Sequence, residues 1–134
     1  MTDRQFTFPA VEKLKSRKLI QQLFAQGKTV HVPLLTCHFL LNPSSLPVRL
    51  QAGVGASARQ FKKATDRNRI KRLLREAYRL NKHSLQETLI QQKSSLAIFL
   101  LYNGKELPTF GNIENAMQQL LPLLQRKIAV VKEN

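Results

Sequence analysis

Cations gathered between positions 59 and 82 are the residues with the clearest capacity for chemistry. This stretch holds ten Lys or Arg against two acidic residues, Asp66 and Glu76, which gives it a charge of +8. The whole chain of 134 residues carries +14, from 22 basic and 8 acidic residues. An imbalance of this size favours a polyanionic partner, either nucleic acid or an anionic surface.

Residues 65–81, TDRNRIKRLLREAYRLN, have the pattern of a helix with two chemically different faces. Apolar residues recur with the spacing of one helix face: Ile70, Leu73, Leu74, Ala77 and Tyr78. A step of about 100° per residue groups polar and basic residues beside and opposite that face: Asn68, Lys71, Arg72, Arg75, Arg79 and Lys82. Like charges at i, i+4 each destabilise an isolated helix by roughly 0.2–0.5 kcal/mol. A bound polyanion would remove this repulsion.

Hydrolytic chemistry by the protein itself is not indicated. Phosphodiester hydrolysis commonly uses two metal ions held by clustered carboxylates or phosphates. The eight carboxylates are scattered along the chain: Asp3, Glu12, Asp66, Glu76, Glu87, Glu106, Glu114 and Glu133. The three histidines show no metal-ligand spacing. We therefore expect neither catalytic residues nor a metal site in this chain.

The remaining composition indicates a cytoplasmic protein of one domain. Cys37 is the single cysteine, which excludes an intramolecular disulfide and favours a reducing compartment. No apolar run approaches the roughly 20 residues of a membrane span, and the polar start does not resemble a signal peptide. We expect one domain over residues 1–134, with residues 1–11 and 129–134 flexible, no membrane association and no required protein partner.

The first half of the chain predicts a helix followed by strands. Ser16 is expected to cap a helix that stops at Gly27 and that has Leu19, Ile20, Leu23 and Phe24 on one face. The apolar residues 30–41 predict one strand and the alternation in 48–54 a second, and we expect the two to form an antiparallel pair. Gly53-Val54-Gly55 is interpreted as a bend or bulge.

The second half predicts a strand between helices. Ser84 and Glu87 match a capping box that would begin a helix over 85–92. The continuous apolar run 96–102 is typical of a strand in the middle of a sheet. A last helix is expected from Asn112, kinked or shortened by Pro122. The order of elements indicates an α+β fold, with helices packed against a small mixed sheet.

The central stretch also resembles a known family. Residues 66–76, DRNRIKRLLRE, are similar to the RNR signature of the bacterial ribonuclease P protein component. The resemblance covers most of the chain and implies an αβββαβα sandwich with a left-handed crossover. It implies the protein subunit of the endoribonuclease that removes the 5′ leader of precursor tRNA in the cytoplasm. In this family catalysis resides in the RNA subunit, which holds most of the Mg²⁺.

The resemblance further implies two RNA-binding surfaces. One faces the catalytic RNA and comprises the signature helix with its preceding loop: Arg59, Lys62, Lys63, Arg67, Asn68, Arg69, Lys71, Arg72, Arg75 and Arg79. The other is a cleft for the single-stranded leader of precursor tRNA, comprising Ile20, Phe24 and His38. The family usually has Ser-Lys-Lys after its second apolar strand, where this chain has Ser57-Ala58-Arg59 with a single cation.

Two other classes of protein fit part of the pattern. A ribosomal or other structural RNA-binding protein agrees equally well in charge and size, and only the RNR signature separates it from ribonuclease P. A DNA-binding regulator with a helix-turn-helix would need a second helix joined by a turn of about 3–4 residues just before the basic helix. The sequence there predicts an extended segment and a cationic loop instead.

Overall fold

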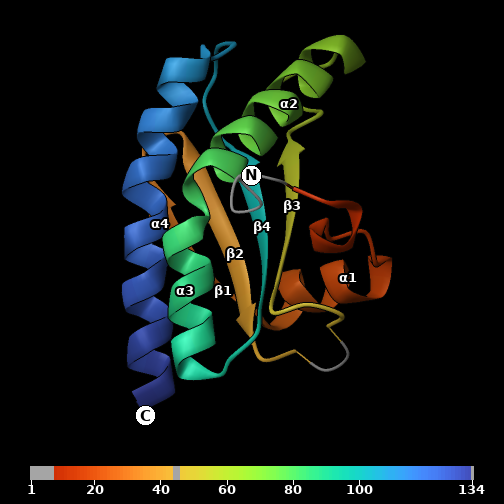
Figure 1. Cartoon of the computed structure of the whole chain (residues 1–134). Coiled ribbons are helices and arrows are strands. Elements are labelled where there is room, and N and C mark those ends of the chain that lie inside the picture. Colours follow the sequence, from red (N-terminus) through yellow and green to blue (C-terminus); the bar gives the residue numbers. More distant parts are fainter. Residues whose placement is uncertain (1–7, 44–45, 134) are drawn as a thin grey trace.

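The structure is built on a four-stranded mixed sheet with the strand order β1-β2-β4-β3 (Figure 1). It is a computed structural model that describes residues 8–43 and 46–133. The elements follow one another as the 3₁₀ turn η2 (Ala10–Glu12), α1 (Arg17–Gln26), β1 (Lys28–Val32), β2 (Leu35–Leu41), β3 (Leu50–Ala56), α2 (Ala64–Asn81), α3 (His83–Gln92), β4 (Leu96–Tyr102) and α4 (Phe110–Glu133). After the 3₁₀ turn, this order is the expected αβββαβα sandwich, extended by α3.

Strand β4 has the expected central position, but the expected pairing of the earlier strands is wrong. β2 pairs antiparallel with β4, and β3 pairs with the other side of β4 in the parallel direction. The strands predicted as 30–41 and 48–54 are therefore not neighbours. The most apolar strand, LAIFLLY, separates them, as expected for a continuous apolar run that has a strand on each side.

The predicted single strand over 30–41 is in fact a hairpin. β1 and β2 pair antiparallel, with Val32 opposite Leu35, so the chain reverses through Pro33 and Leu34. Leu34 has φ 80°, a left-handed conformation in which glycine is usual. Neither glycine nor asparagine is present here to signal the turn in the sequence. Leu34 is held there because its side chain packs against the core.

The connection from β3 to β4 is a left-handed crossover. The two strands are parallel, and α2 and α3 link them. In Figure 1 both helices lie in front of the sheet, both strands run upward, and β4 lies to the left of β3. Most parallel crossovers are right-handed. The crossover places α2 over β3, beside the edge of the sheet.

The two faces of the sheet are chemically different. Leu35, Cys37 and Phe39 of β2, like Ile98 and Leu100 of β4, are buried in the core that α2, α3 and α4 cover. The alternate positions of the strands face α1, which contacts β2 and β4. This smaller helix begins as expected, since the Ser16 hydroxyl accepts a hydrogen bond from the Leu19 amide at 3.2 Å. It covers only part of the face, and the rest stays accessible.

The N-terminal segment, residues 8–16, is fastened along the outer edge of β3. The Leu14 amide donates to the carbonyl of Ala52 at 2.9 Å, and the ring of Phe8 lies 5.2 Å from that of Tyr78. Glu12 forms an ion pair with Lys82, whose side chain is 1% exposed. Phe8 thus anchors this segment to the body of the protein. Positions 1–7 lie outside the described residues.

Other details of the helices differ from the sequence expectation. α3 begins at His83, one residue before Ser84, and no side chain caps it, so the capping box does not form. α4 begins at Phe110, where the Thr109 hydroxyl accepts from the Asn112 amide at 3.1 Å. It continues past Pro122 to Glu133, so the proline does not shorten it. Part of the C-terminal stretch that we expected to be flexible is therefore helical.

The Glu12–Lys82 pair leads to a prediction about stability. Removing one partner of a buried ion pair leaves a buried charge without compensation and costs about 3 kcal/mol. We expect Glu12→Ala to lower the free energy of unfolding by about that amount, measured by urea denaturation. Lys82→Met in the Glu12→Ala background should recover part of the loss, because an apolar chain then fills the site. Equal stability of both variants and the parent would contradict a role for the pair.

Candidate nucleic-acid interface

The exposed side of α2 forms a basic face. Its apolar stripe is buried as predicted, with Ile70, Leu74, Ala77 and Tyr78 no more than 1% exposed. Burial of this stripe fixes the rotation of the helix and directs the opposite side to solvent. We define the basic face as six polar and basic residues on this solvent-facing side: Arg67, Asn68, Arg69, Lys71, Arg72 and Arg75. All six are at least partly exposed.

The loop before α2 is held in place by Phe61, which the sequence did not single out, and by Arg67. Phe61 is buried and lies 5.9 Å, ring to ring, from Tyr102. The Arg67 guanidinium donates from Nη1 to the carbonyls of Phe61 at 2.7 Å and Lys62 at 2.9 Å. Arg67 therefore fixes the loop as well as belonging to the basic face. A guanidinium has five N–H donors, so its other nitrogens remain to meet an anion. Arg59, Lys62 and Lys63 are exposed in this loop.

Two cations assigned to this helix surface have acidic partners. Arg79 donates to both carboxylate oxygens of Glu76, at 3.1 and 2.7 Å, and this hydrogen bonding lowers the pKa of Glu76. Lys82, which the helical spacing put on the exposed arc, is instead buried beside Glu12. The expectation for Lys82 is wrong because α2 ends at Asn81, and Lys82 begins the turn into α3.

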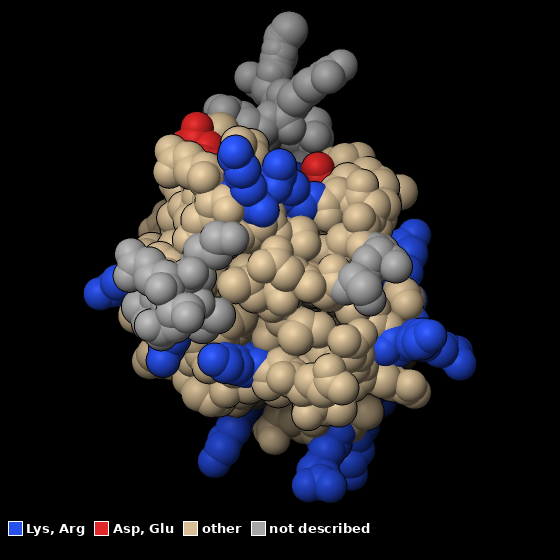
Figure 2. Space-filling view, turned by 90° about the horizontal axis from the view of Figure 1, so that it is seen from below, with Lys and Arg blue, Asp and Glu red and all other residues tan. Residues whose placement is uncertain are grey.

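The basic face is not neutralised from within the protein. In residues 8–43 and 46–129, the ion pairs are Arg79 with Glu76, Lys82 with Glu12, and His83 with Glu87. None of them includes Arg69, Lys71, Arg72 or Arg75. Figure 2 shows the underside of Figure 1, where most Lys and Arg lie toward the rim of a face whose centre is largely uncharged.

A second surface is formed by aromatic rings on the opposite face of the sheet. Phe24 of α1 is 43% exposed, and its ring lies 4.4 Å from His38 of β2 and 5.3 Å from Phe99 of β4. We call Phe24, His38 and Phe99 the aromatic cluster. The structure thus brings together Phe24 and His38, which the family resemblance had paired. Ile20 lies half-buried one helical turn before Phe24.

Glycines of β3 make room for this cluster. A Cβ at Gly53 would lie 2.7 Å from Cδ2 of Phe99, and one at Gly55 would lie 2.9 Å from its Cε1. Neither glycine forms the bend or bulge that we expected, because β3 keeps an unbroken parallel register with β4. Their function is to let the ring of Phe99 lie flat across the neighbouring strand.

A cavity of about 500 Å³, with several polar side chains in its wall, adjoins the cluster at His38. Thr36 lies in its wall, where its hydroxyl accepts from Asn103 Nδ2 at 2.8 Å and lies 3.1 Å from His31 Nδ1. The other lining residues are Thr29, Ser57, Gln60, Leu101, Tyr102 and Gly104. Aromatic rings beside donors and acceptors suit unstacked nucleobases, which stack on the rings and present polar edges.

Desolvation favours the neutral forms of two ionisable groups of β2, the partly buried His38 and the core residue Cys37. Burial, and to a smaller degree the charge of His31, lowers the pKa of His38. At neutral pH the ring that faces Phe24 is therefore an uncharged imidazole. Burial raises the pKa of the Cys37 thiol. Cys37 is fully buried in the core as a free thiol.

Sequence reasoning missed Phe99 and the glycines beneath it. Phe99 lies within an apolar run whose residues all look like core, so composition gave no sign that it faces α1. The alternation of the strand was the available signal, since Ile98 and Leu100 point to the opposite face.

Neither a cluster of metal ligands nor a membrane-spanning helix occurs among the described residues. In that part of the chain, no three His, Cys, Asp or Glu side chains gather where they could hold a metal ion. No described helix is both long and apolar enough to cross a membrane.

Comparison with known sequences gives one consistent result. The family model described as Ribonuclease P matches residues 8–125. The ribonuclease P protein component of Porphyromonas gingivalis (strain ATCC 33277) is 36% identical over 110 residues, which is 82% of this chain and 80% of that protein. The corresponding protein of Desulfovibrio desulfuricans is 30% identical over 126 residues, which is 92% of this chain and 88% of that protein.

Solved structures share the fold at lower sequence identity. The ribonuclease P protein of Staphylococcus aureus superposes with a TM-score of 0.66 at 18% identity, over 84% of this chain and 94% of that one. The ribonuclease P protein of Thermotoga maritima gives a TM-score of 0.58 at 24% identity, over 86% of this chain and 96% of that one. The α+β arrangement described above is thus the fold of those proteins.

The lowered pKa of His38 predicts a pH effect on stability. Above its usual value of about 6.5, His38 is neutral in both the folded and unfolded states. Below that value the unfolded chain binds the proton first, so stability should fall until the pH reaches the folded pKa. His38→Asn should remove this component. Urea unfolding between about pH 5 and 8 should show that the free energy of unfolding falls less at acid pH for the variant than for the parent. The same pH dependence in both proteins would contradict the assignment.

Proposed function

Because the chain belongs to the family of bacterial ribonuclease P protein components, we propose that it binds a catalytic RNA and the 5′ leader of precursor tRNA. In this proposal it assists RNA-catalysed, Mg²⁺-dependent removal of the leader. The basic face of α2 and the preceding loop contact the catalytic RNA. The aromatic cluster and its adjoining cavity receive the leader. Both partners are in the cytoplasm, and no other protein is required.

The basic face is the observation that supports this proposal most. Arg69, Lys71, Arg72 and Arg75 project from one rigid helix and take part in none of the ion pairs among the described side chains. Guanidinium and ammonium groups at this spacing suit closely spaced backbone phosphates. Each phosphate that is neutralised releases counterions, which adds affinity that falls as salt is raised.

The aromatic cluster favours single-stranded RNA over a duplex. In a duplex the bases are stacked on one another and cannot lie on protein rings, whereas a single-stranded leader has bases that can be splayed out. A base stacked on an exposed aromatic ring contributes about 1–3 kcal/mol. Phe24 offers such a ring, and His38 and Phe99 support it from below.

The protein's contribution is to bind and orient RNA, and hydrolysis is assigned to the RNA subunit. Mg²⁺ held by that RNA would supply the activated nucleophile and the charge stabilisation that hydrolysis needs. Cations on α2 lower the repulsion between the phosphates of substrate and catalytic RNA. Substrate should therefore bind at lower Mg²⁺ when the protein is present.

Reconstituted cleavage tests the function directly. Precursor tRNA is incubated with the cognate RNA subunit at low Mg²⁺, with and without the protein, and with an Arg69→Ala/Arg72→Ala variant. We expect the protein to stimulate release of the leader and the variant to do so less, because it neutralises two fewer phosphates. The protein without RNA should leave the substrate intact. Specific cleavage by the protein alone would overturn the assignment of catalysis to RNA.

Phe24→Ala tests the leader surface. We expect the assembled enzyme to lose about 1–3 kcal/mol in binding precursor tRNA, the value of one stacked base, and to bind mature tRNA unchanged. Filter binding of the two RNAs measures the difference. Val11→Ala is a matched control, since Val11 is equally exposed at 45% but lies in the 3₁₀ turn. An equal loss for both RNAs with Phe24→Ala would indicate a core role for the ring.

A further inference from the structure

A small cavity at the outer edge of β3 brings together cations from two separate segments. Its volume is about 170 Å³. Lys13 and Lys15 enter it from the N-terminal segment, and Lys71 and Arg75 enter it from α2. The rest of its wall is apolar or backbone: Phe8, Leu14, Ala52, Gly53 and Val54. We call this site the edge cavity.

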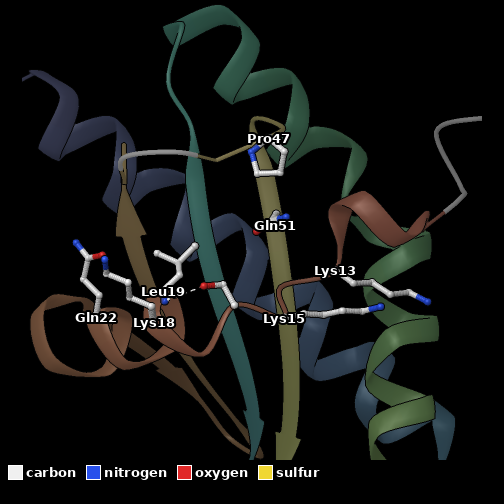
Figure 3. Close-up of a pocket in the computed structure, with 8 residues that line it drawn as sticks. Lys13, Lys15, Lys18, Leu19, Gln22, Pro47 and Gln51 are labelled. Atoms are coloured by element: carbon white, nitrogen blue, oxygen red, sulfur yellow. Dashed lines mark hydrogen bonds between the residues drawn. The ribbon is translucent and has the colours of Figure 1, made fainter.

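The two lysines of the N-terminal segment are held toward α2. The bond from the Leu14 amide to Ala52 fixes the backbone between them, and Nζ of Lys13 lies 5.6 Å from the centre of the Phe8 ring. In the close-up of Figure 3, Lys13 and Lys15 both extend toward α2, whereas Lys18 and Gln22 project from α1 on the other side. These lysines therefore extend the cations of α2 around the edge of the sheet.

The edge cavity has a strong excess of positive charge. None of its lining residues is acidic, and its four cations take part in no ion pair formed by the described residues. Lys13 and Lys71 are also half-buried, so water screens their repulsion less than at the surface. A bound anion would replace the repulsion among these cations with attraction.

The cavity lies where the two proposed RNA surfaces meet. Lys71 and Arg75 belong to the basic face. Gly53, in the opposite wall, is the residue over which the ring of Phe99 lies in the aromatic cluster. A strand of RNA that leaves the cluster along β3 would thus pass the edge cavity before it reaches α2. The small volume suits one phosphate group and excludes a duplex.

On the basis of the proposed function, we propose that the edge cavity binds a backbone phosphate of the precursor-tRNA leader. Lys13 and Lys15, which lie outside the signature helix, are its specific ligands, and Lys71 and Arg75 complete it. The ammonium groups act as flexible point charges, so the site recognises the backbone and is indifferent to leader sequence.

The test uses the assembled enzyme with Lys13→Gln/Lys15→Gln, which keeps much of each side-chain stem and removes the charges. Binding of precursor tRNA and of the corresponding mature tRNA is measured as a function of salt. We expect the slope of log K against log[salt] to fall by about 0.7 for each phosphate that is no longer neutralised, with precursor tRNA only. Affinity for the catalytic RNA should not change. Lys127→Ala, an exposed cation of α4, is the control for general loss of charge.

Three results would overturn the inference. They are an unchanged slope with precursor tRNA, an equal change with mature tRNA, and a loss of affinity for the catalytic RNA instead. Urea unfolding of the double variant checks that the N-terminal segment still docks. If Phe24→Ala lowers leader binding and the lysine variant does not, only the edge cavity is rejected. If neither variant affects leader binding, the proposed leader surface itself is rejected.

Discussion

Burial of one stripe of α2 is the constraint on which both RNA surfaces depend. Ile70, Leu74, Ala77 and Tyr78 are at most 1% exposed, so the helix cannot rotate without bringing cations into the core, where an uncompensated charge is very costly. The same burial that stabilises the fold therefore keeps the basic face in solvent. Its like-charge repulsion is tolerated because tertiary packing, rather than helix propensity, supplies most of the stability of the helix.

The position of β4 determines how the two surfaces are related. Since β4 pairs with β2 on one side and β3 on the other, β3 becomes an edge strand and α2 packs above it. The aromatic cluster forms on the other face of the same strands. The surface suited to bases and the surface suited to phosphates thus lie on opposite sides of the same strands. The N-terminal segment closes the edge between them, held there by the Glu12–Lys82 pair and by the packing of Phe8 on Tyr78.

Glycine at positions 53 and 55 shows how the sheet serves the site. A side chain at either position would come within 3 Å of the ring of Phe99. With glycine there, Phe99 can lie over β3 and support Phe24, which remains 43% exposed. The strand loses side-chain packing at two positions. In return it gains an aromatic surface next to a cavity that offers hydrogen-bonding groups.

The sequence by itself determined the helices, the central strand and the cationic surface, because each depends on the periodicity of side chains along a single segment. Residues 65–81 predicted a buried stripe and a basic face, and the run 96–102 predicted a central strand. Tertiary structure alone decided which strands pair, since an apolar strand can accept either neighbour in either direction. It also decided the turn at Pro33 and Leu34, where core packing holds a leucine at positive φ. Lys82 was assigned to the wrong surface because the helix ended one residue before it, and its acidic partner lies 70 residues away in the chain. Contacts between distant segments determine the positions of Phe99, Lys13 and Lys15. No local sequence pattern encodes such contacts.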